Sequence, residues 1–162
     1  MPLTIRPAVA ADRPALGRLG ALLVEVHHQF DPRRFIAPTP RTAAGYGGFL
    51  SGQIGHEGTV VLVAEEDGAV VGYTYAALEG NDWLTLRGPA GVIYDLAVDP
   101  AHRRHGVGRR LMEETIAALE ALGAPQVMLS TAEPNEKAQH LFASLGFRPT
   151  LIEMTRERGG KG

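Results

Sequence analysis

Cysteine is absent from this chain of 162 residues. Its absence excludes disulfide bonds, thiolate ligands for a metal and a cysteine nucleophile. Long apolar runs are lacking too, so no segment predicts a bilayer span, and the N-terminal stretch 1–6 has no signal-peptide core. We therefore expect a soluble cytoplasmic protein that makes no contact with a membrane.

A strong excess of either charge is also missing. The 16 Lys and Arg residues nearly balance the 18 Asp and Glu residues, for a formal net charge of −2. The basic residues form one local cluster rather than a broad face, which argues against a nucleic-acid partner. An apolar fraction of 44% is ordinary for a globular protein. We expect one domain over residues 1–156, followed by a flexible polar tail at 157–162.

The most informative segment is a basic loop that contains two glycines. Four arginines and two histidines lie between His102 and Arg110, with no acid among them. Cations at the start of a helix oppose its macrodipole, so the loop favours a bound anion. Gly106 and Gly108 leave backbone N–H groups accessible to such an anion. The segment therefore predicts a cradle for a phosphate or pyrophosphate.

The hydrophobic periodicity predicts a mixed α/β sheet in the order β-α-α-β-β-β-α-β-α-β. Asp12 is expected to cap the first helix, Asp67-Gly68 to form a hairpin turn, and Gly123 and Gly146 to end helices. The expected strands are 3–6, 59–66, 69–79, 92–98, 126–131 and 147–155, and the expected helices are 12–26, 46–54, 107–122 and 134–145. The last strand is expected at a sheet edge, where it could support a homodimer.

Two common phosphate-binding patterns do not fit the loop. A P-loop needs Lys and Ser or Thr after its last glycine, and Gly108 is followed by two arginines. A dinucleotide fingerprint needs a third glycine where this chain has Leu111. The pattern that remains is R-x-x-G-x-G, formed by residues 103–108 directly after a predicted strand.

This pattern resembles the acetyl-CoA-binding motif of the GNAT superfamily of N-acetyltransferases. A second segment, 135–147, resembles the family pattern N-x-x-A-x-x-L-Y-x-x-x-G-F, with Phe142 in place of the tyrosine. The resemblance covers nearly the whole chain and is most specific over residues 92–147. It implies a mostly antiparallel sheet flanked by helices on both faces.

The resemblance also implies where acetyl-CoA binds. Main-chain groups of the central strand would pair with the pantetheine arm, and Asn135 and Phe142 would lie near its thiol end. Arg103 would flank the pyrophosphate. The main-chain positions implied are Leu96, Ala97 and Val98 for the arm, and Arg104, His105, Gly106, Val107, Gly108 and Arg109 for the pyrophosphate.

The expected reaction is direct attack of an amine on the thioester in a ternary complex, since there is no cysteine to carry the acetyl group. Asp95, an acid in an apolar strand, is the first candidate for the base, with Glu79 and Glu133 behind it. Asp95 can equally be a structural acid satisfied by hydrogen bonds. Strand alternation places Tyr94 on the opposite face, as a core aromatic or as a substitute for the acid missing at Phe142.

The acceptor amine cannot be read from the sequence, and it can belong to a small molecule or to a protein. Two other functions stay open: a CoA-binding regulatory module without turnover, and an interaction domain that binds anions. No metal site is expected, because His102 and His105 have no third ligand close to them in the chain.

Overall fold

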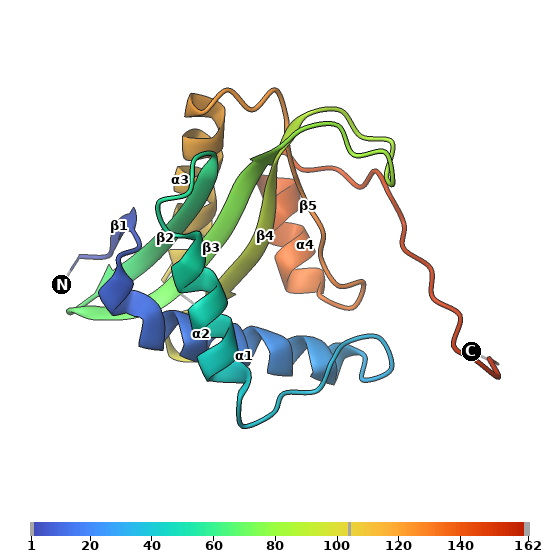
Figure 1. Cartoon of the computed structure of the whole chain (residues 1–162), viewed down its shortest axis with the longest axis horizontal. Coiled ribbons are helices and arrows are strands. Elements are labelled where there is room, and N and C mark those ends of the chain that lie inside the picture. The colour runs from blue at the N-terminus through green and yellow to red at the C-terminus, as the bar shows by residue number, and fades with distance from the viewer. Residues whose placement is uncertain (1, 104, 161–162) are drawn as a thin grey trace.

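A computed structural model describes residues 2–103 and 105–160 of the chain (Figure 1). The described elements follow the order predicted from the sequence as far as the last helix. They are β1 (Thr4–Pro7), η1 (Ala10–Asp12), α1 (Arg13–Phe30), α2 (Thr42–Gln53), β2 (Thr59–Glu66), β3 (Ala69–Glu79), β4 (Ala90–Val98), η2 (Pro100–His102), α3 (Val107–Ala121), β5 (Val127–Leu129) and α4 (Glu136–Ser144).

The sheet has the strand order β1-β2-β3-β4-β5. Neighbouring strands are antiparallel except for the parallel pair β4–β5. Helices α1 and α2 cover one face, where Leu16 and Leu50 pack against Tyr73. Helices α3 and α4 cover the other, where Met112 and Phe142 pack against Ile93. The predicted mixed sheet with helices on both faces is confirmed, and each such apolar side chain contributes about 1.5–3 kcal/mol when fully buried.

The local turn predictions are confirmed. Asp67 and Gly68 have φ values of 52° and 78°, as a two-residue turn between antiparallel strands requires. Gly123 and Gly146 follow α3 and α4 with φ values of 96° and 93°, a conformation that favours glycine at the end of a helix. Leu122, the C-cap residue between α3 and Gly123, is 46% exposed.

Asp12 lies at the expected N-cap position of α1 but does not cap it through its side chain. Its carboxylate accepts hydrogen bonds from the Arg6 guanidinium at 2.8 and 2.9 Å and from the Val9 N–H at 2.8 Å. Hydrogen bonding to Arg6 lowers the pKa of Asp12. The buried carboxylate therefore joins β1 to the start of α1.

The predicted last strand, 147–155, is wrong. No residue after Leu129 is assigned to a strand in the part of the chain that the structure describes. After α4 and Phe147, the C-terminal segment runs along the outside of the molecule (Figure 1), where Leu151 and Met154 are exposed. Glu153 pairs there with Arg34, with Nη2 and Oε2 3.0 Å apart. The strand-like composition is present, but a strand also needs a neighbour for its backbone hydrogen bonds.

Helices α1 and α2 approach each other through glycines. A Cβ atom on Gly17 would lie 2.3 Å from the backbone oxygen of Ala43, and one on Gly47 would lie 2.8 Å from that of Arg13. A Cβ on Gly20 would lie 2.3 Å from the ring of Tyr46. These glycines weaken each helix by itself, but they allow the two helices to pack closely.

We expect Gly47→Ala to destabilise the fold by roughly 1–3 kcal/mol, since its methyl group would push α1 and α2 apart. Gly45→Ala, two residues earlier in the same helix, is the matched control because a Cβ there meets nothing within 4 Å. It should be neutral or stabilise by about 0.4–1 kcal/mol. Urea unfolding of both variants measures the difference, and equal stabilities would contradict the role given to Gly47.

Candidate active site

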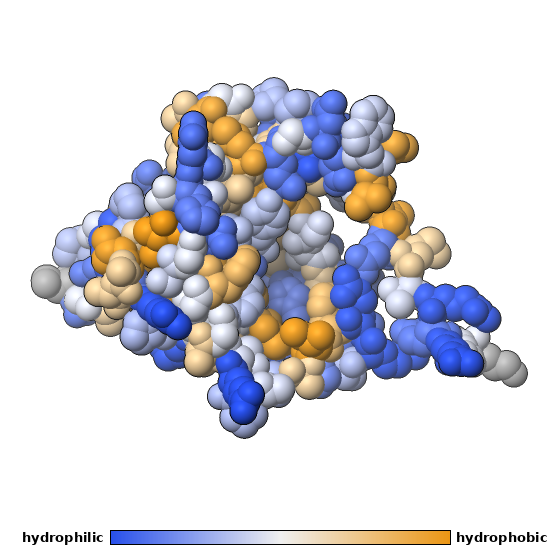
Figure 2. All heavy atoms as spheres, viewed as in Figure 1, coloured by the Kyte–Doolittle hydropathy of each residue, from blue (hydrophilic) through white to orange (hydrophobic). Residues whose placement is uncertain are grey.

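Strand β4 has a partner on both edges over only part of its length. It pairs with β3 from Ala90 to Val98, but its described pairing with β5 covers only Gly91–Ile93. Beyond Ile93 a cleft of about 930 Å³ opens between β4, the end of α1 and the start of α4. This hollow is visible near the centre of Figure 2.

The open edge of β4 presents backbone groups to this cleft. The Asp99 N–H donates to the Val71 oxygen at 2.8 Å, which marks a hydrogen-bonded pair between β4 and β3. Because such pairs alternate along an antiparallel ladder, Ala97 also faces β3, whereas Leu96 and Val98 face the cleft. The Val98 oxygen accepts a hydrogen bond from Arg103 Nε at 3.2 Å. Leu96 and Val98 can therefore pair with an extended ligand.

Helix α3 begins at the end of the same cleft. Its N-cap, Gly106, has φ 71° and provides no side-chain cap. The backbone N–H groups of Val107, Gly108 and Arg109 precede the first intrahelical hydrogen bond, from the Arg110 N–H to the Gly106 oxygen. Gly108 and Arg103 line the cleft. The described part of the predicted cradle thus presents the start of a helix, whose first N–H groups have no intrahelical partner and can bind an anion, while Arg104 lies outside the described residues.

Several side chains of this loop are engaged elsewhere. Val107 is fully buried. Arg109 Nη2 donates to Ser144 Oγ at 2.6 Å, which ties α3 to α4. His105 Nδ1 lies 4.0 Å from a carboxylate oxygen of Glu66. The His105 N–H also donates to the His102 oxygen at 3.3 Å, so the backbone donors left for a ligand are those of the first turn of α3.

The two residues singled out near the start of α4 both line the cleft. The Asn135 side chain caps α4 by accepting from the Ala138 N–H at 3.2 Å. Phe142 is 8% exposed and its ring packs against Phe147, with centroids 6.1 Å apart. Both residues therefore have structural roles in addition to any contact with a ligand.

The expectation that Tyr94 and Asp95 lie on opposite faces of the sheet is wrong. The β3–β4 register shifts between Tyr75 and Ala76, so that Tyr75 is opposite Asp95 but Ala76 is opposite Ile93. Tyr94 is the additional residue of this β-bulge, which breaks the strand alternation. Its ring lies against that of Tyr75, with centroids 4.9 Å apart, and both Tyr94 and Asp95 line the cleft.

Asp95 accepts two hydrogen bonds from tyrosines. The hydroxyl groups of Tyr46 on α2 and Tyr73 on β3 donate to the same oxygen, Oδ2, at 2.6 and 2.9 Å. Burial raises the pKa of Asp95, while the two hydroxyl groups act in the opposite direction. Oδ1 can still accept a proton from a group in the cleft. The structural role and the catalytic role considered for Asp95 are thus compatible with one geometry.

Tyr94 is 43% exposed and reaches the cleft from the bulge. Burial and the nearby carboxylate of Glu79 raise its pKa to about 12. Its hydroxyl group is therefore protonated at neutral pH and can act as a proton donor. Glu79 itself pairs with Arg87 at 3.4 Å, and Glu133 is exposed and not part of the cleft lining.

Sequence reasoning missed the partners of Asp95. Tyr46 was expected only as an apolar position of a helix, and Tyr73 only as part of a hairpin strand. His27, at the end of α1, also lines the cleft. No spacing rule connects these positions with residue 95. Tyr73 approaches Asp95 through the pairing of β3 with β4, and Tyr46 and His27 approach it only when α1 and α2 pack on the sheet.

The sequence matches the model of the acetyltransferase (GNAT) family over residues 23–147. Among similar curated proteins, the mycothiol acetyltransferase of Thermobispora bispora is 37% identical over 101 residues, covering 60% of this chain and 32% of that protein. The mycothiol acetyltransferase of Acidothermus cellulolyticus is 34% identical over 107 residues, covering 61% and 33%. The chain thus spans about a third of the length of these relatives.

Solved structures share the fold. A mutant of the BH1408 protein from Bacillus halodurans superposes with a TM-score of 0.80 at 24% identity, covering 95% of this chain and 98% of that one. An aminoglycoside acetyltransferase from an uncultured soil metagenomic sample gives a TM-score of 0.66 at 20% identity, covering 96% and 95%. In the described residues, no helix is both long and apolar enough to cross a membrane.

We expect Asp95→Asn to melt no lower than the wild type at about pH 8. Because burial raises the folded-state pKa of Asp95, its favourable contribution exists below the unfolded pKa and is lost as the pH rises through the folded pKa. Asparagine avoids the cost of ionisation, and its oxygen still accepts from both tyrosines. Thermal melts between about pH 4 and pH 8 should therefore show its relative stability increasing with pH.

Asp99→Asn is the control, because the pKa of Asp99 is shifted in the opposite direction to that of Asp95. A hydrogen bond from the Ala101 N–H lowers the pKa of Asp99, so this carboxylate stabilises the fold above its unfolded pKa and stops doing so as the pH falls through its folded pKa. Asp99→Asn should be less stable than the wild type at about pH 8. A large loss of stability in Asp95→Asn at that pH would mean that ionised Asp95 supports the fold.

Proposed function

Because the chain belongs to the GNAT family of acetyltransferases, we propose that it transfers an acetyl group from acetyl-CoA to an amine. The observation that carries the proposal is the continuity of three features in one cleft. The open edge of β4 at Leu96 and Val98 leads at one end to the free N–H groups of α3 and at the other to Asp95.

Acetyl-CoA fits these features by its chemistry. Its pyrophosphate matches the backbone donors in the first turn of α3 at Gly108 and Arg109, supported by the positive end of the helix dipole. Its pantetheine arm contains amides, which can pair with Leu96 and Val98 as an added strand would. The thioester then lies beside Tyr94 and Asp95, where β4 bulges.

The amine must lose a proton to become a nucleophile. A lysine-like amine has a reference pKa near 10.4, so neutralising it at pH 7 costs roughly 4–5 kcal/mol. Asp95 takes this proton at Oδ1, directly or through a water molecule, and its raised pKa suits a base. The amine nitrogen attacks the acetyl carbon, the N–C bond forms and the C–S bond breaks. Backbone N–H groups of β4 stabilise the oxyanion.

The thiolate that leaves must be protonated. Phe142 cannot do this, although the family pattern has tyrosine at that position. Tyr94 carries a protonated hydroxyl group into the cleft and is the donor we propose. A water molecule or the substrate ammonium itself is the alternative source.

The acceptor enters on the side of the cleft formed by the end of α1. Phe30, Phe35 and Ile36 line this side together with His27. An amine attached to an apolar or cyclic body would contact these side chains while its nitrogen faces Asp95. Small-molecule amines and protein amines both remain candidates for this position.

Thiol release from acetyl-CoA with a panel of polyamines, amino acids, aminoglycosides and peptides tests the function. We expect release that depends on one class of amine and falls about 10²-fold or more in Asp95→Asn, because a general base contributes about 10²–10⁴-fold. Tyr94→Phe should lower the rate by about 10²-fold, and adding Phe142→Tyr should restore part of it.

The other outcomes identify the alternatives. Binding of CoA without turnover on any amine would favour a CoA-binding regulatory module. Failure to bind CoA at all would favour an interaction domain that binds other anions. An unchanged rate in Tyr94→Phe would leave water or the substrate ammonium as the proton source.

Gly108→Val tests the cradle. A Cβ there would make ordinary contacts, 3.6 Å from Leu141 and 3.8 Å from Val98, so the fold can accept one. The branched side chain would instead obstruct the approach of a phosphate to the N–H groups. At one hundred times Kd, acetyl-CoA should stabilise the wild type by about 2.7 kcal/mol, and we expect Gly108→Val to bind at least roughly tenfold more weakly.

Gly52→Val on α2, where a Cβ meets nothing within 4 Å, controls for the cost of valine in a helix. A nicotinamide dinucleotide at the same concentration should not raise the melting temperature. Normal binding of acetyl-CoA by Gly108→Val would place the cradle elsewhere.

A further inference from the structure

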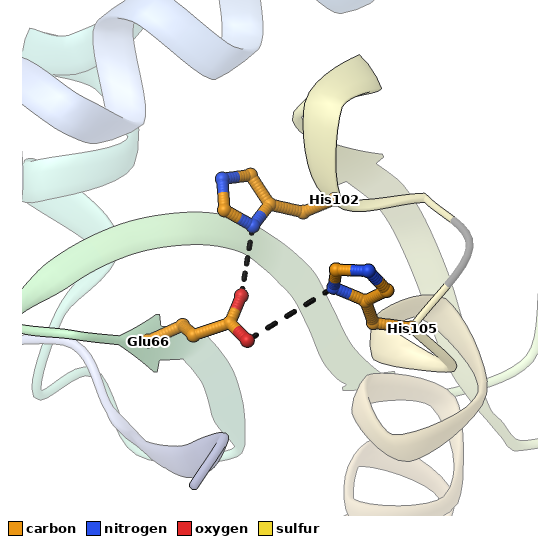
Figure 3. A group of neighbouring side chains, drawn as sticks. All are labelled: Glu66, His102 and His105. Atoms are coloured by element: carbon orange, nitrogen blue, oxygen red, sulfur yellow. Dashed lines mark hydrogen bonds and ion pairs between the residues drawn. The ribbon is translucent and has the colours of Figure 1, made fainter. Parts of the chain in front are cut away.

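Three side chains that can bind a metal converge beside the basic loop. His102 Nδ1 lies 2.8 Å from one carboxylate oxygen of Glu66, and His105 Nδ1 lies 4.0 Å from the other. Figure 3 shows both imidazole rings directing a nitrogen toward the carboxylate between them. One ligand atom from each of the three residues lies within 4.8 Å of the other two.

The fold brings this group together from two distant segments. Glu66 is the last residue of β2, immediately before the hairpin turn. His102 ends η2, and His105 directly precedes Gly106, the N-cap of α3. The Glu66 side chain is 20% exposed and the His102 side chain 32%. Glu66 lies 36 residues before His102, so the spacing around the two histidines gives no sign of a third ligand.

We propose that Glu66, His102 and His105 bind a zinc ion. Two ligands of a tetrahedral zinc, each about 2.0–2.1 Å from the ion, are about 3.4 Å apart. The two observed separations, 2.8 and 4.0 Å, lie on either side of that value. A hydrogen bond explains the position of His102, but 4.0 Å is too long for a hydrogen bond from His105. A bound metal ion, in contrast, would account for the approach of all three side chains.

The ligand set consists of two imidazoles and one carboxylate. Such a set suits a transition metal that accepts imidazole ligands and disfavours magnesium or calcium, which prefer oxygen ligands. The His105 side chain is 60% exposed, so water can complete the coordination. Two neighbouring guanidinium groups are directed to other partners, that of Arg103 to the Val98 oxygen and that of Arg109 to Ser144.

The zinc ion would connect the end of β2 to the loop that leads into α3. Glu66, His102 and His105 do not line the cleft that contains Asp95. The ion is therefore structural, and it holds the loop residues that precede the free N–H groups of α3. The site does not depend on acetyl transfer, so it can be tested without a turnover assay.

Titration of the full chain with Zn²⁺, after dialysis against a chelator, tests the site by calorimetry. Co²⁺ then serves as a spectroscopic probe, because tetrahedral Co²⁺ absorbs strongly in the visible range. We expect one equivalent to bind with tetrahedral Co²⁺ bands. Glu66→Gln, His102→Asn and His105→Asn should each weaken binding by about tenfold or more, since even an outer partner of a metal ligand changes affinity 10–100-fold.

His140→Asn is the matched control, because His140 is exposed on α4 and should leave binding unchanged. Zn²⁺ should raise the melting temperature of the wild type and of His140→Asn but not of the three site variants. Wild-type affinity in the site variants would overturn the proposal. So would a His102→Asn variant that melts earlier but binds Zn²⁺ normally, because the group would then serve as a hydrogen bond alone.

Discussion

The partial pairing of β4 is the constraint on which the rest of the site depends. A strand with neighbours on both edges satisfies all its backbone groups, whereas β4 loses its outer neighbour after Ile93. The outward backbone groups of Leu96 and Val98 are then open to a partner other than a strand, and the Val98 oxygen already accepts from Arg103. The divergence of β4 and β5 also makes room for a ligand, and it directs the open edge toward the start of α3. The incomplete pairing of β4 thus provides the cleft, exposes the backbone groups of Leu96 and Val98 to it, and directs the open edge toward α3.

The bulge at Tyr94 adds the chemical groups. By breaking alternation it brings Tyr94 to the cleft beside Asp95, which a regular strand would not do. The close packing of α1 on α2 through Gly17 and Gly20 then allows Tyr46 to reach the Asp95 carboxylate. Residues that reduce local helix stability therefore contribute to the geometry of the site.

Local predictions were accurate where one short segment contains all the necessary information. The turn at Asp67-Gly68 and the helix ends before Gly123 and Gly146 depend on backbone conformations that glycine favours, and each is confirmed. The prediction of a strand at 147–155 failed because a strand needs a neighbouring strand, and a β-like composition does not supply one. Asp12 was placed at the right position, but its carboxylate binds Arg6 instead of the helix end.

The sequence by itself determined the order of elements up to α4 and the position of the basic glycine loop, because both depend on spacing along the chain, and the motifs of residues 103–108 and 135–147 were enough to show the resemblance to the GNAT family. Only the tertiary structure decided which side chains meet. Asp95 finds Tyr46 and Tyr73, and Glu66 finds His102, through contacts between segments far apart in the chain. Such contacts depend on strand register and helix packing, and no local pattern records them.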